Sequence, residues 1–118
     1  MADPLQTVAE VPQFIRDRRA AGLSEEEHKL IVDTIAANPT MGEEVQGSGG
    51  VRKVRFAGRG KGKSGGYRVM VAYLGEDVPV YLLALLSKGE RANFTAAEIA
   101  AFKTLTREIS YYWKRRTR

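Results

Sequence analysis

The sequence predicts an α+β domain in which an N-terminal α-hairpin packs on an antiparallel β-meander that is followed by a C-terminal helix. Apolar residues recur at helical spacing near both ends of the chain, and the middle is rich in β-branched and aromatic residues. Capping-box patterns at 24–27 and 95–98 mark the starts of two helices. Because consecutive strands lie between these helices, the class is α+β. We expect one domain over residues 1–118.

The first part of the chain predicts a short strand and two helices. Residues 5–9 form the strand, and residues 11–21 place three apolar side chains on one helical face. Gly22 ends this helix, and Ser24 begins the next through a capping box. The second helix ends near Asn38, because the proline that follows disfavours the α conformation at the residue before it. The short connection predicts antiparallel packing of the two helices.

The second part predicts three strands and a long helix. Residues 51–56 and 67–74 are predicted strands, joined by a glycine-rich loop over 58–66. Residues 78–86 are nearly all apolar, which predicts a central strand buried on both faces. Thr95 begins a final helix whose apolar residues recur at helical spacing.

The positive charge of the chain is concentrated in one short segment. The formal net charge is +5, and residues 51–68 hold seven of the 19 basic side chains and no acidic one. The seven are Arg52, Lys53, Arg55, Arg59, Lys61, Lys63 and Arg68. A second basic run contains Lys114, Arg115, Arg116 and Arg118. Clustered positive charge costs mutual repulsion that a polyanion relieves, so these segments predict nucleic-acid binding.

The composition excludes several classes of site. The chain has no cysteine, which excludes disulfides and thiolate metal ligands, and its single histidine, His28, argues against a histidine metal cluster. We therefore expect no metal and no cofactor. The N-terminal residues lack the features of a signal peptide, and the longest apolar run is too short to span a bilayer. The sequence predicts a cytoplasmic protein with no membrane partner.

Residues 57–64 fit a relaxed phosphate-loop pattern, with alanine at its first glycine position. Such a loop requires a strand before it and a helix after it, so that the helix N-terminus faces the phosphates. Strand-like residues 67–71 follow instead, which argues against a nucleotide site. Flexible glycines and lysines can still bind phosphate in another context. The alternative is a solvated hairpin loop whose charge serves only solubility.

Aromatic residues beside the basic segments have two interpretations. Phe56 and Tyr67 flank the loop, where they either stack on bases or belong to the core. Phe94 precedes the final helix, where it either stacks on a base or forms a hydrophobic staple with Ile99. Residues 111–116 combine three aromatic and three basic side chains, which either grip RNA or form an ordinary helix end with favourable cations.

Several segments carry a family resemblance. They are Gly47–Phe56, Gly60–Val69, Val80–Leu83, Ser87–Glu90 and Asn93–Thr95. Together they resemble the RelE/HigB-type toxins of bacterial type II toxin–antitoxin systems, and the likeness is closest to the HigB-like branch. The run Gly-Lys-Ser-Gly-Gly-x-Arg is its most specific part. The resemblance extends from the α-hairpin to the final helix and implies a small RelE-like domain.

The resemblance implies a toxin that docks in the A site of the 70S ribosome and cuts messenger RNA without a metal. The ribose 2′-hydroxyl attacks the adjacent phosphate and expels the 5′-oxygen, which leaves a cyclic phosphate. Cations stabilise the extra charge on the phosphorane, and a lysine crowded by other cations loses its proton more easily and can act as general base. The catalytic positions of the family match Lys61, Lys63, Arg68 and Lys88.

One position departs from the family pattern. Several RelE members carry a catalytic tyrosine six residues after the cation that Lys88 matches, and this chain has Phe94 there. Phenylalanine cannot exchange a proton, although some HigB-like members also lack the tyrosine. Lys88 replaces the arginine of other members and gives charge without a bidentate fork. The general acid and base therefore stay unassigned.

The remaining cations are expected to hold ribosomal RNA. They are Arg52, Lys53, Arg55, Arg59, Lys114, Arg115 and Arg116. The resemblance also implies a cognate antitoxin that covers or distorts the basic site; such antitoxins often carry a helix-turn-helix, so promoter DNA is contacted only through the antitoxin. Three alternatives stay open: a non-cleaving RNA- or antitoxin-binding protein, which Phe94 favours, a relative that poisons DNA gyrase, and, more distantly, direct DNA binding by the basic loop.

Overall fold

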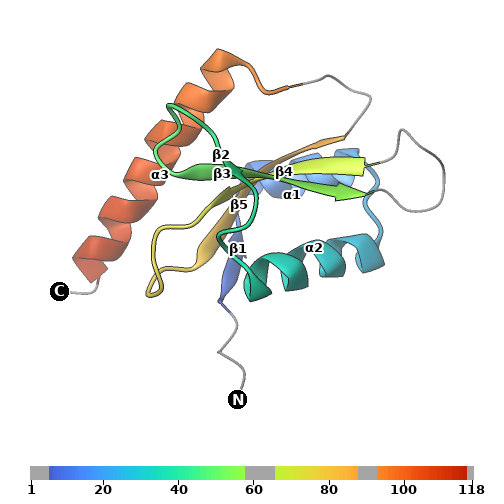
Figure 1. Cartoon of the computed structure of the whole chain (residues 1–118), viewed down its shortest axis with the longest axis horizontal. Helices are drawn as coiled ribbons and strands as arrows, with labels where there is room; N and C mark the ends of the chain where they lie inside the picture. The colour runs from blue at the N-terminus through green and yellow to red at the C-terminus, as the bar shows by residue number, and fades with distance from the viewer. Residues whose placement is uncertain (1–5, 58–65, 88–92, 117–118) are drawn as a thin grey trace.

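A computed structural model of the chain describes residues 6–57, 66–87 and 93–116. The elements in chain order are β1 (Val8–Glu10), α1 (Pro12–Ala20), α2 (Glu25–Ala37), β2 (Glu43–Glu44), β3 (Val51–Ala57), β4 (Gly66–Ala72), β5 (Val80–Ser87) and α3 (Ala96–Arg116). Within these residues the strands form one sheet of order β1-β5-β4-β3-β2 (Figure 1). β3, β4 and β5 are antiparallel neighbours, which confirms the predicted meander.

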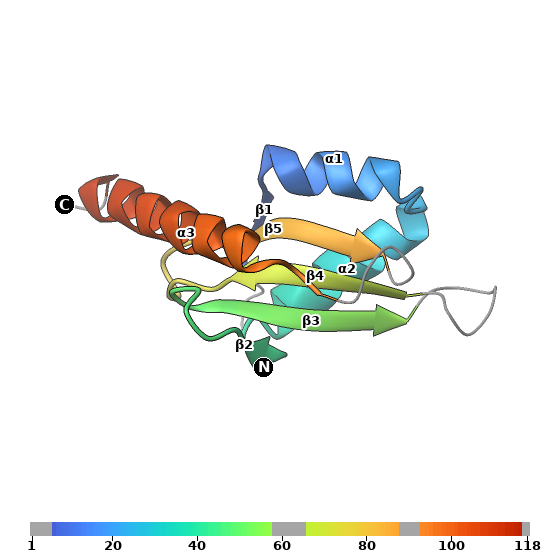
Figure 2. The same ribbon diagram turned by 90° about the horizontal axis from the view of Figure 1, so that it is seen from above.

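The sheet has a buried core on each face. The core of α1 and α2 contains Phe14, Ile31, Ile35, Val54, Val69, Val71, Val80, Leu82 and Leu85. The core of α3 contains Val51, Met70, Ala72, Leu83, Ala84, Leu86, Phe94 and Phe102. Figure 1 shows α2 and α3 on opposite sides of the sheet, and Figure 2 shows α1 beside β5. Helices therefore cover both faces of the meander, and the α-hairpin and the C-terminal helix lie where the sequence predicts them.

Local sequence signals explain where the helices begin and end. The Ser24 hydroxyl accepts the Glu27 N–H at 3.0 Å, and the Glu27 carboxylate accepts the Ser24 N–H at 3.0 Å. Thr95 and Glu98 make the same reciprocal pair at 3.1 and 2.7 Å. Gly22, which follows α1, has a φ of +71°. These capping boxes satisfy backbone donors that the first turn of a helix leaves without partners, so both predicted starts are confirmed.

The edges of the sheet differ from the prediction. The first strand is Val8–Glu10 instead of residues 5–9, and it pairs in parallel with β5. The short strand Glu43–Glu44 was not predicted, because two glutamates have low strand propensity and only their pairing with β3 makes them a strand. β5 lies between β1 and β4 and is buried over most of its length, as its apolar sequence predicts.

Gly42 allows β2 to approach β3 closely, and its replacement by alanine is expected to be costly. Its φ is +89°, and a Cβ there would lie 2.5 Å from the Lys53 carbonyl oxygen. Gly22 has a similar φ of +71°, but a Cβ on it would meet no atom within 4 Å, so it is the matched control. We expect Gly22→Ala to cost about 1–2 kcal/mol and Gly42→Ala roughly 3 kcal/mol or more. Urea unfolding measures both, and equal losses would contradict the proposed collision with Lys53.

Candidate functional site

Two arginines face each other at one end of the sheet. In the antiparallel register of β3 and β4, Arg55 pairs with Arg68, and Ala57 pairs with Gly66. On the other side of β4, Arg68 pairs with Leu86 near the end of β5. Figure 2 shows that β3 and β5 end at the side of the sheet where β4 begins. Strand pairing thus brings together two arginines from consecutive strands.

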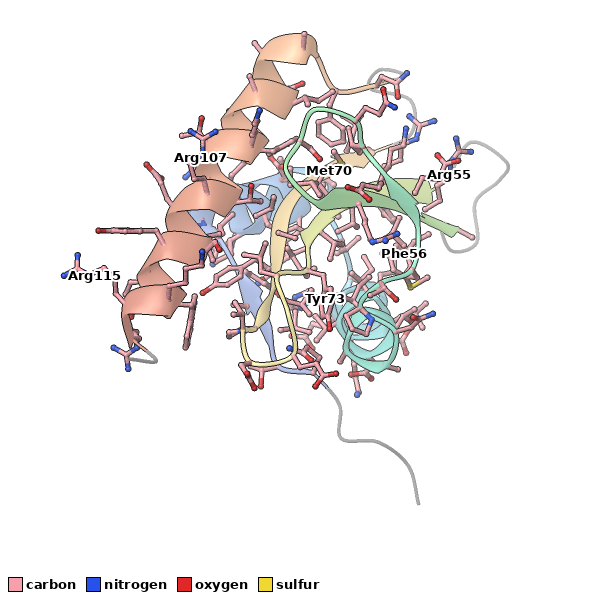
Figure 3. The ribbon with its side chains drawn as sticks, turned by 60° about the vertical axis from the view of Figure 1, so that its left-hand side comes forward. Arg55, Phe56, Met70, Tyr73, Arg107 and Arg115 are labelled. Atoms are coloured by element: carbon pink, nitrogen blue, oxygen red, sulfur yellow. The ribbon has the colours of Figure 1, made fainter. Side chains whose placement is uncertain are left out.

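Arg55 and Arg68 lie on the face of the sheet that α3 covers. Residues directly opposite each other in an antiparallel pair share a face, and side chains two positions apart along a strand do so as well. Met70, two residues after Arg68, and Leu86, its partner, both belong to the core beneath α3. Arg68 is half-buried and Arg55 is exposed at the strand end. Figure 3 shows Arg55 at this end, beyond Met70. The pair is therefore a cationic end to an otherwise apolar face.

Phe94 belongs to the core next to this cationic end. Its side chain is 9% exposed, and its ring meets that of Phe102 edge-on at 5.5 Å between centroids. Ile99, its expected staple partner, packs against the same core. An edge-to-face aromatic pair stabilises the position of both rings. Phe94 therefore holds the start of α3 against the sheet, and its burial fits the structural interpretation instead of base stacking.

Tyr67 and Phe56 lie on the opposite face of the sheet from Arg68. Both are partly buried and pack against the core of α1 and α2. The Tyr67 hydroxyl donates to the Glu27 carboxylate at 3.4 Å. Burial raises the pKa of Tyr67 above its ordinary value of 10.0, and the negative charge and hydrogen bond of Glu27 raise it further. Tyr67 is thus a neutral structural phenol, and stacking beside Arg68 does not fit this placement.

The other predicted RNA contacts on β3 are divided between the two faces. Arg52 alternates with Val51, so it lies on the α2 side, and its Nη1 donates to the Gly42 carbonyl at 3.0 Å. Lys53 lies on the same face as Arg55, and its backbone pairs with that of Glu43 in β2. The structure therefore brings Arg55 and Arg68 together and directs Arg52 elsewhere.

The basic residues at the end of α3 form a separate aromatic and cationic surface. The Arg115 guanidinium lies 5.6 Å from the centre of the Tyr111 ring, and Arg116 lies 5.6 Å from that of Tyr112. Trp113 Nε1 donates to the Tyr81 hydroxyl at 2.8 Å, which fixes this helix end to β5. Figure 3 shows Arg115 and Arg55 on opposite sides of the molecule. Lys114, Arg115 and Arg116 therefore do not join the Arg55–Arg68 pair.

Four predicted site residues lie outside the described residues. They are Arg59, Lys61, Lys63 and Lys88. The first three belong to the segment that connects Ala57 with Gly66, and these two residues are paired. Lys88 directly follows Ser87, and Ser87 pairs with Tyr67. Both segments therefore start from the sheet end that carries Arg55 and Arg68. β4 begins at Gly66, where a nucleotide-binding phosphate loop requires a helix, so the nucleotide interpretation is wrong.

Two arginines at paired positions on one face of the sheet are suited to bind phosphate oxygens. Arginine donates through a planar fork and remains charged, so it holds a phosphate in a defined orientation and stabilises added negative charge. Among the described residues, no cluster of three or more His, Asp or Glu side chains suits a metal ion. No helix within the described ranges is long and apolar enough to cross a membrane.

One family model and one solved structure are similar to this chain. A family model described as the RelE toxin of the RelE/RelB toxin–antitoxin system matches residues 10–116. A solved structure of Escherichia coli toxin RelE, a double arginine-to-alanine mutant in the free state, superposes with a TM-score of 0.55. Its sequence is 17% identical, and the match covers 86% of this chain and 96% of that one. At this identity the structural likeness concerns the fold.

Proposed function

Because this chain belongs to the RelE family of toxins from toxin–antitoxin systems, we propose that it is a ribosome-dependent endoribonuclease that cleaves messenger RNA in the A site and so inhibits translation. The single observation that supports this activity best is the Arg55–Arg68 pair on the α3 face of the sheet. From the same sheet end the chain continues into the segments that contain Lys61, Lys63 and Lys88. A concentration of cations at one edge suits a reaction that adds charge to a phosphate.

In the proposed reaction Arg68 binds the scissile phosphate, and Lys61, Lys63 and Lys88 supply further charge and share the proton transfers. The ribose 2′-oxygen forms a bond to phosphorus while the bond from phosphorus to the 5′-oxygen breaks. One group removes the 2′-hydroxyl proton and another protonates the departing 5′-oxygen, leaving a cyclic phosphate. No metal takes part. Buried Phe94 supplies no proton, so the lysines are the candidates for both transfers.

The proposal also includes partners and a branch of the family. We assign the chain to the HigB-like branch on the sequence segments described above. A cognate antitoxin, bearing a helix-turn-helix that binds the promoter of the system, is expected to cover the basic sheet end. Arg55 and the C-terminal cations are proposed to contact ribosomal RNA in the cytoplasm. Charge complementarity to this cationic sheet end implies an acidic antitoxin segment.

A non-cleaving ribosome-binding protein is the second candidate, and Phe94 favours it. Its ring is buried against Phe102 at the position where a proton-transferring tyrosine is expected. Such a protein would inhibit translation by occupying the A site alone. Its inhibition would follow occupancy of the ribosome and leave the messenger intact.

The test is cleavage of a defined messenger RNA by the purified protein, with and without programmed ribosomes, mapped by primer extension in the presence of a chelator. We expect cuts within codons that require ribosomes and persist with chelator. A chelator-sensitive reaction would contradict the metal-independent chemistry. Intact messenger on ribosomes that bind the protein would establish the non-cleaving candidate.

A further inference from the structure

A second cationic surface lies on α3, away from the Arg55–Arg68 pair. A groove of about 350 Å³ is lined by Gly49, Leu74, Lys103, Thr106, Arg107, Ser110, Tyr111 and Lys114. Three of these side chains are basic and none is acidic. Figure 3 shows Arg107 on α3 on the side of the molecule opposite Arg55. The groove is thus a separate feature, and the cleavage chemistry proposed above does not use it.

Helical spacing places the basic residues of the groove in one row. Lys103, Arg107 and Lys114 stand four and seven positions apart, which brings them to the same side of α3 over three turns. Glu108 is the next residue after Arg107 and therefore points to a different side of the helix. A row of like charges along a rigid helix matches the regular negative charges of a nucleic-acid backbone.

The opposite wall of the groove is a rigid glycine-containing turn. Gly49 has a φ of +78°, and a Cβ there would lie 3.3 Å from Thr106 Oγ1 and 3.4 Å from Lys103 Cγ. The buried Ser48 hydroxyl donates to the Val45 carbonyl at 2.6 Å and accepts the Val51 N–H at 3.0 Å. The Thr106 hydroxyl of α3 donates to the Ser48 carbonyl oxygen at 3.5 Å, which joins the turn to the helix. The groove is therefore formed before any ligand arrives, which lowers the entropic cost of binding.

Tyr111 gives the groove an aromatic rim. Its side chain is 63% exposed, and Arg115 lies over its ring at 5.6 Å. Proteins that bind single-stranded nucleic acid combine a cationic channel for the backbone with exposed aromatic rings on which bases stack. An acidic polypeptide would pair with the cations, but it has no base to stack on the exposed ring. This combination favours single-stranded RNA as the occupant.

We propose that the groove between α3 and the Gly49 turn binds single-stranded RNA, with backbone phosphates on Lys103, Arg107 and Lys114 and a base stacked on Tyr111. The proposal rests on the proposed function, because a toxin that cleaves RNA on the ribosome needs RNA contacts other than the one to the cleaved phosphate. This contact surface lies on the far side of the molecule from the Arg55–Arg68 pair.

The experiment measures binding of a fluorescent oligouridine to the full chain over a range of salt concentrations. Removal of one cation that pairs with a phosphate reduces the slope of log K against log salt by about 0.7 for a single strand. We expect Lys103→Gln with Arg107→Gln to reduce the slope by about 1.4 and the affinity by about 25-fold at 0.1 M salt. The matched control is Arg16→Gln with Arg19→Gln, which removes two exposed cations from α1.

The control pair removes the same net charge from the α1 side. Equal losses of RNA affinity in both double variants would show that only the overall charge matters and would overturn the proposal. Tyr111→Leu is expected to weaken RNA binding about tenfold at an unchanged salt slope. Unchanged RNA affinity in that variant would show that no base stacks on Tyr111 and that the groove binds polyanions in general. Polyglutamate that binds as tightly as RNA, with the same loss in the groove variant, would assign the groove to an acidic protein instead.

The outcome is independent of catalysis. RNA binding that depends on the groove supports the inference even if no messenger is cleaved. If the protein cleaves messenger on ribosomes but the groove variants bind oligouridine as tightly as the unsubstituted protein, the inference about the groove is wrong and the proposed function stands. Both double variants change only exposed side chains, so circular dichroism and thermal melting should match those of the unsubstituted protein.

Discussion

Replacement of Arg68 by alanine is expected to reduce messenger cleavage on programmed ribosomes by about 10²- to 10³-fold. The guanidinium lies on the α3 face opposite Arg55, at the sheet end from which the lysine-bearing segments continue. A fork of charged donors aimed at phosphate is worth most when charge develops in the transition state. Single-turnover cleavage by ribosome-bound protein measures the chemical step, and we expect the binding of the variant to ribosomes to change much less than this rate.

Two further variants test whether geometry or net charge is responsible. Arg68→Lys keeps the charge but loses the fork, and we expect it to recover only part of the rate. Arg52→Ala removes the same charge from β3, but Arg52 lies on the other face and donates to the Gly42 carbonyl. Its cleavage rate should stay close to that of the unsubstituted protein. An equal loss for Arg52→Ala and Arg68→Ala would show that overall charge controls the reaction, and a parallel loss of ribosome binding would favour the non-cleaving candidate.

The sequence predicted best what local chemistry decides. Both capping boxes and the stop at Gly22 depend on residues within a few positions of each other, so they are visible without a partner. β2 could not be predicted, since Glu43 and Glu44 become a strand only through pairing with Lys53 and Arg52. The parallel pairing of β1 with β5 likewise depends on residues that are distant in the sequence.

The candidate site shows the same division. The sequence identified a basic segment, but alternation along β3 separates Arg52 from Arg55, and only the β3–β4 register places Arg55 opposite Arg68. The groove on α3 was missed, although Lys103 and Arg107 have a four-residue helical spacing that marks one side of a helix. Its other wall is Gly49, and a sequence pattern does not say which turn packs against which helix.

The largest loss of stability is expected for Phe14→Ala. Phe14 is fully buried between α1 and the sheet, and alanine leaves a cavity among Ile31, Ile35 and the β5 residues of the same core. Such replacements cost about 3–5 kcal/mol, and a domain of this size has only about 5–15 kcal/mol in total. The expected fall in melting temperature is on the order of 10–20 °C. Leu30→Ala removes an apolar side chain that is 52% exposed, so its cost should stay below about 0.5 kcal/mol.

The effect of Phe14→Ala on activity tests whether α1 only stabilises the fold or also positions the reacting groups. Its helix also supplies Asp17, whose carboxylate accepts the Leu85 N–H at 2.9 Å, so α1 fixes the strand that leads to Lys88. Below its melting temperature the variant should retain most of the single-turnover cleavage rate per folded molecule, whereas half-buried Arg68→Ala should lose much less stability and cleave slowly. A Phe14→Ala protein that is folded yet as slow as Arg68→Ala would mean that α1 positions the reacting groups through β5 and does more than stabilise the fold.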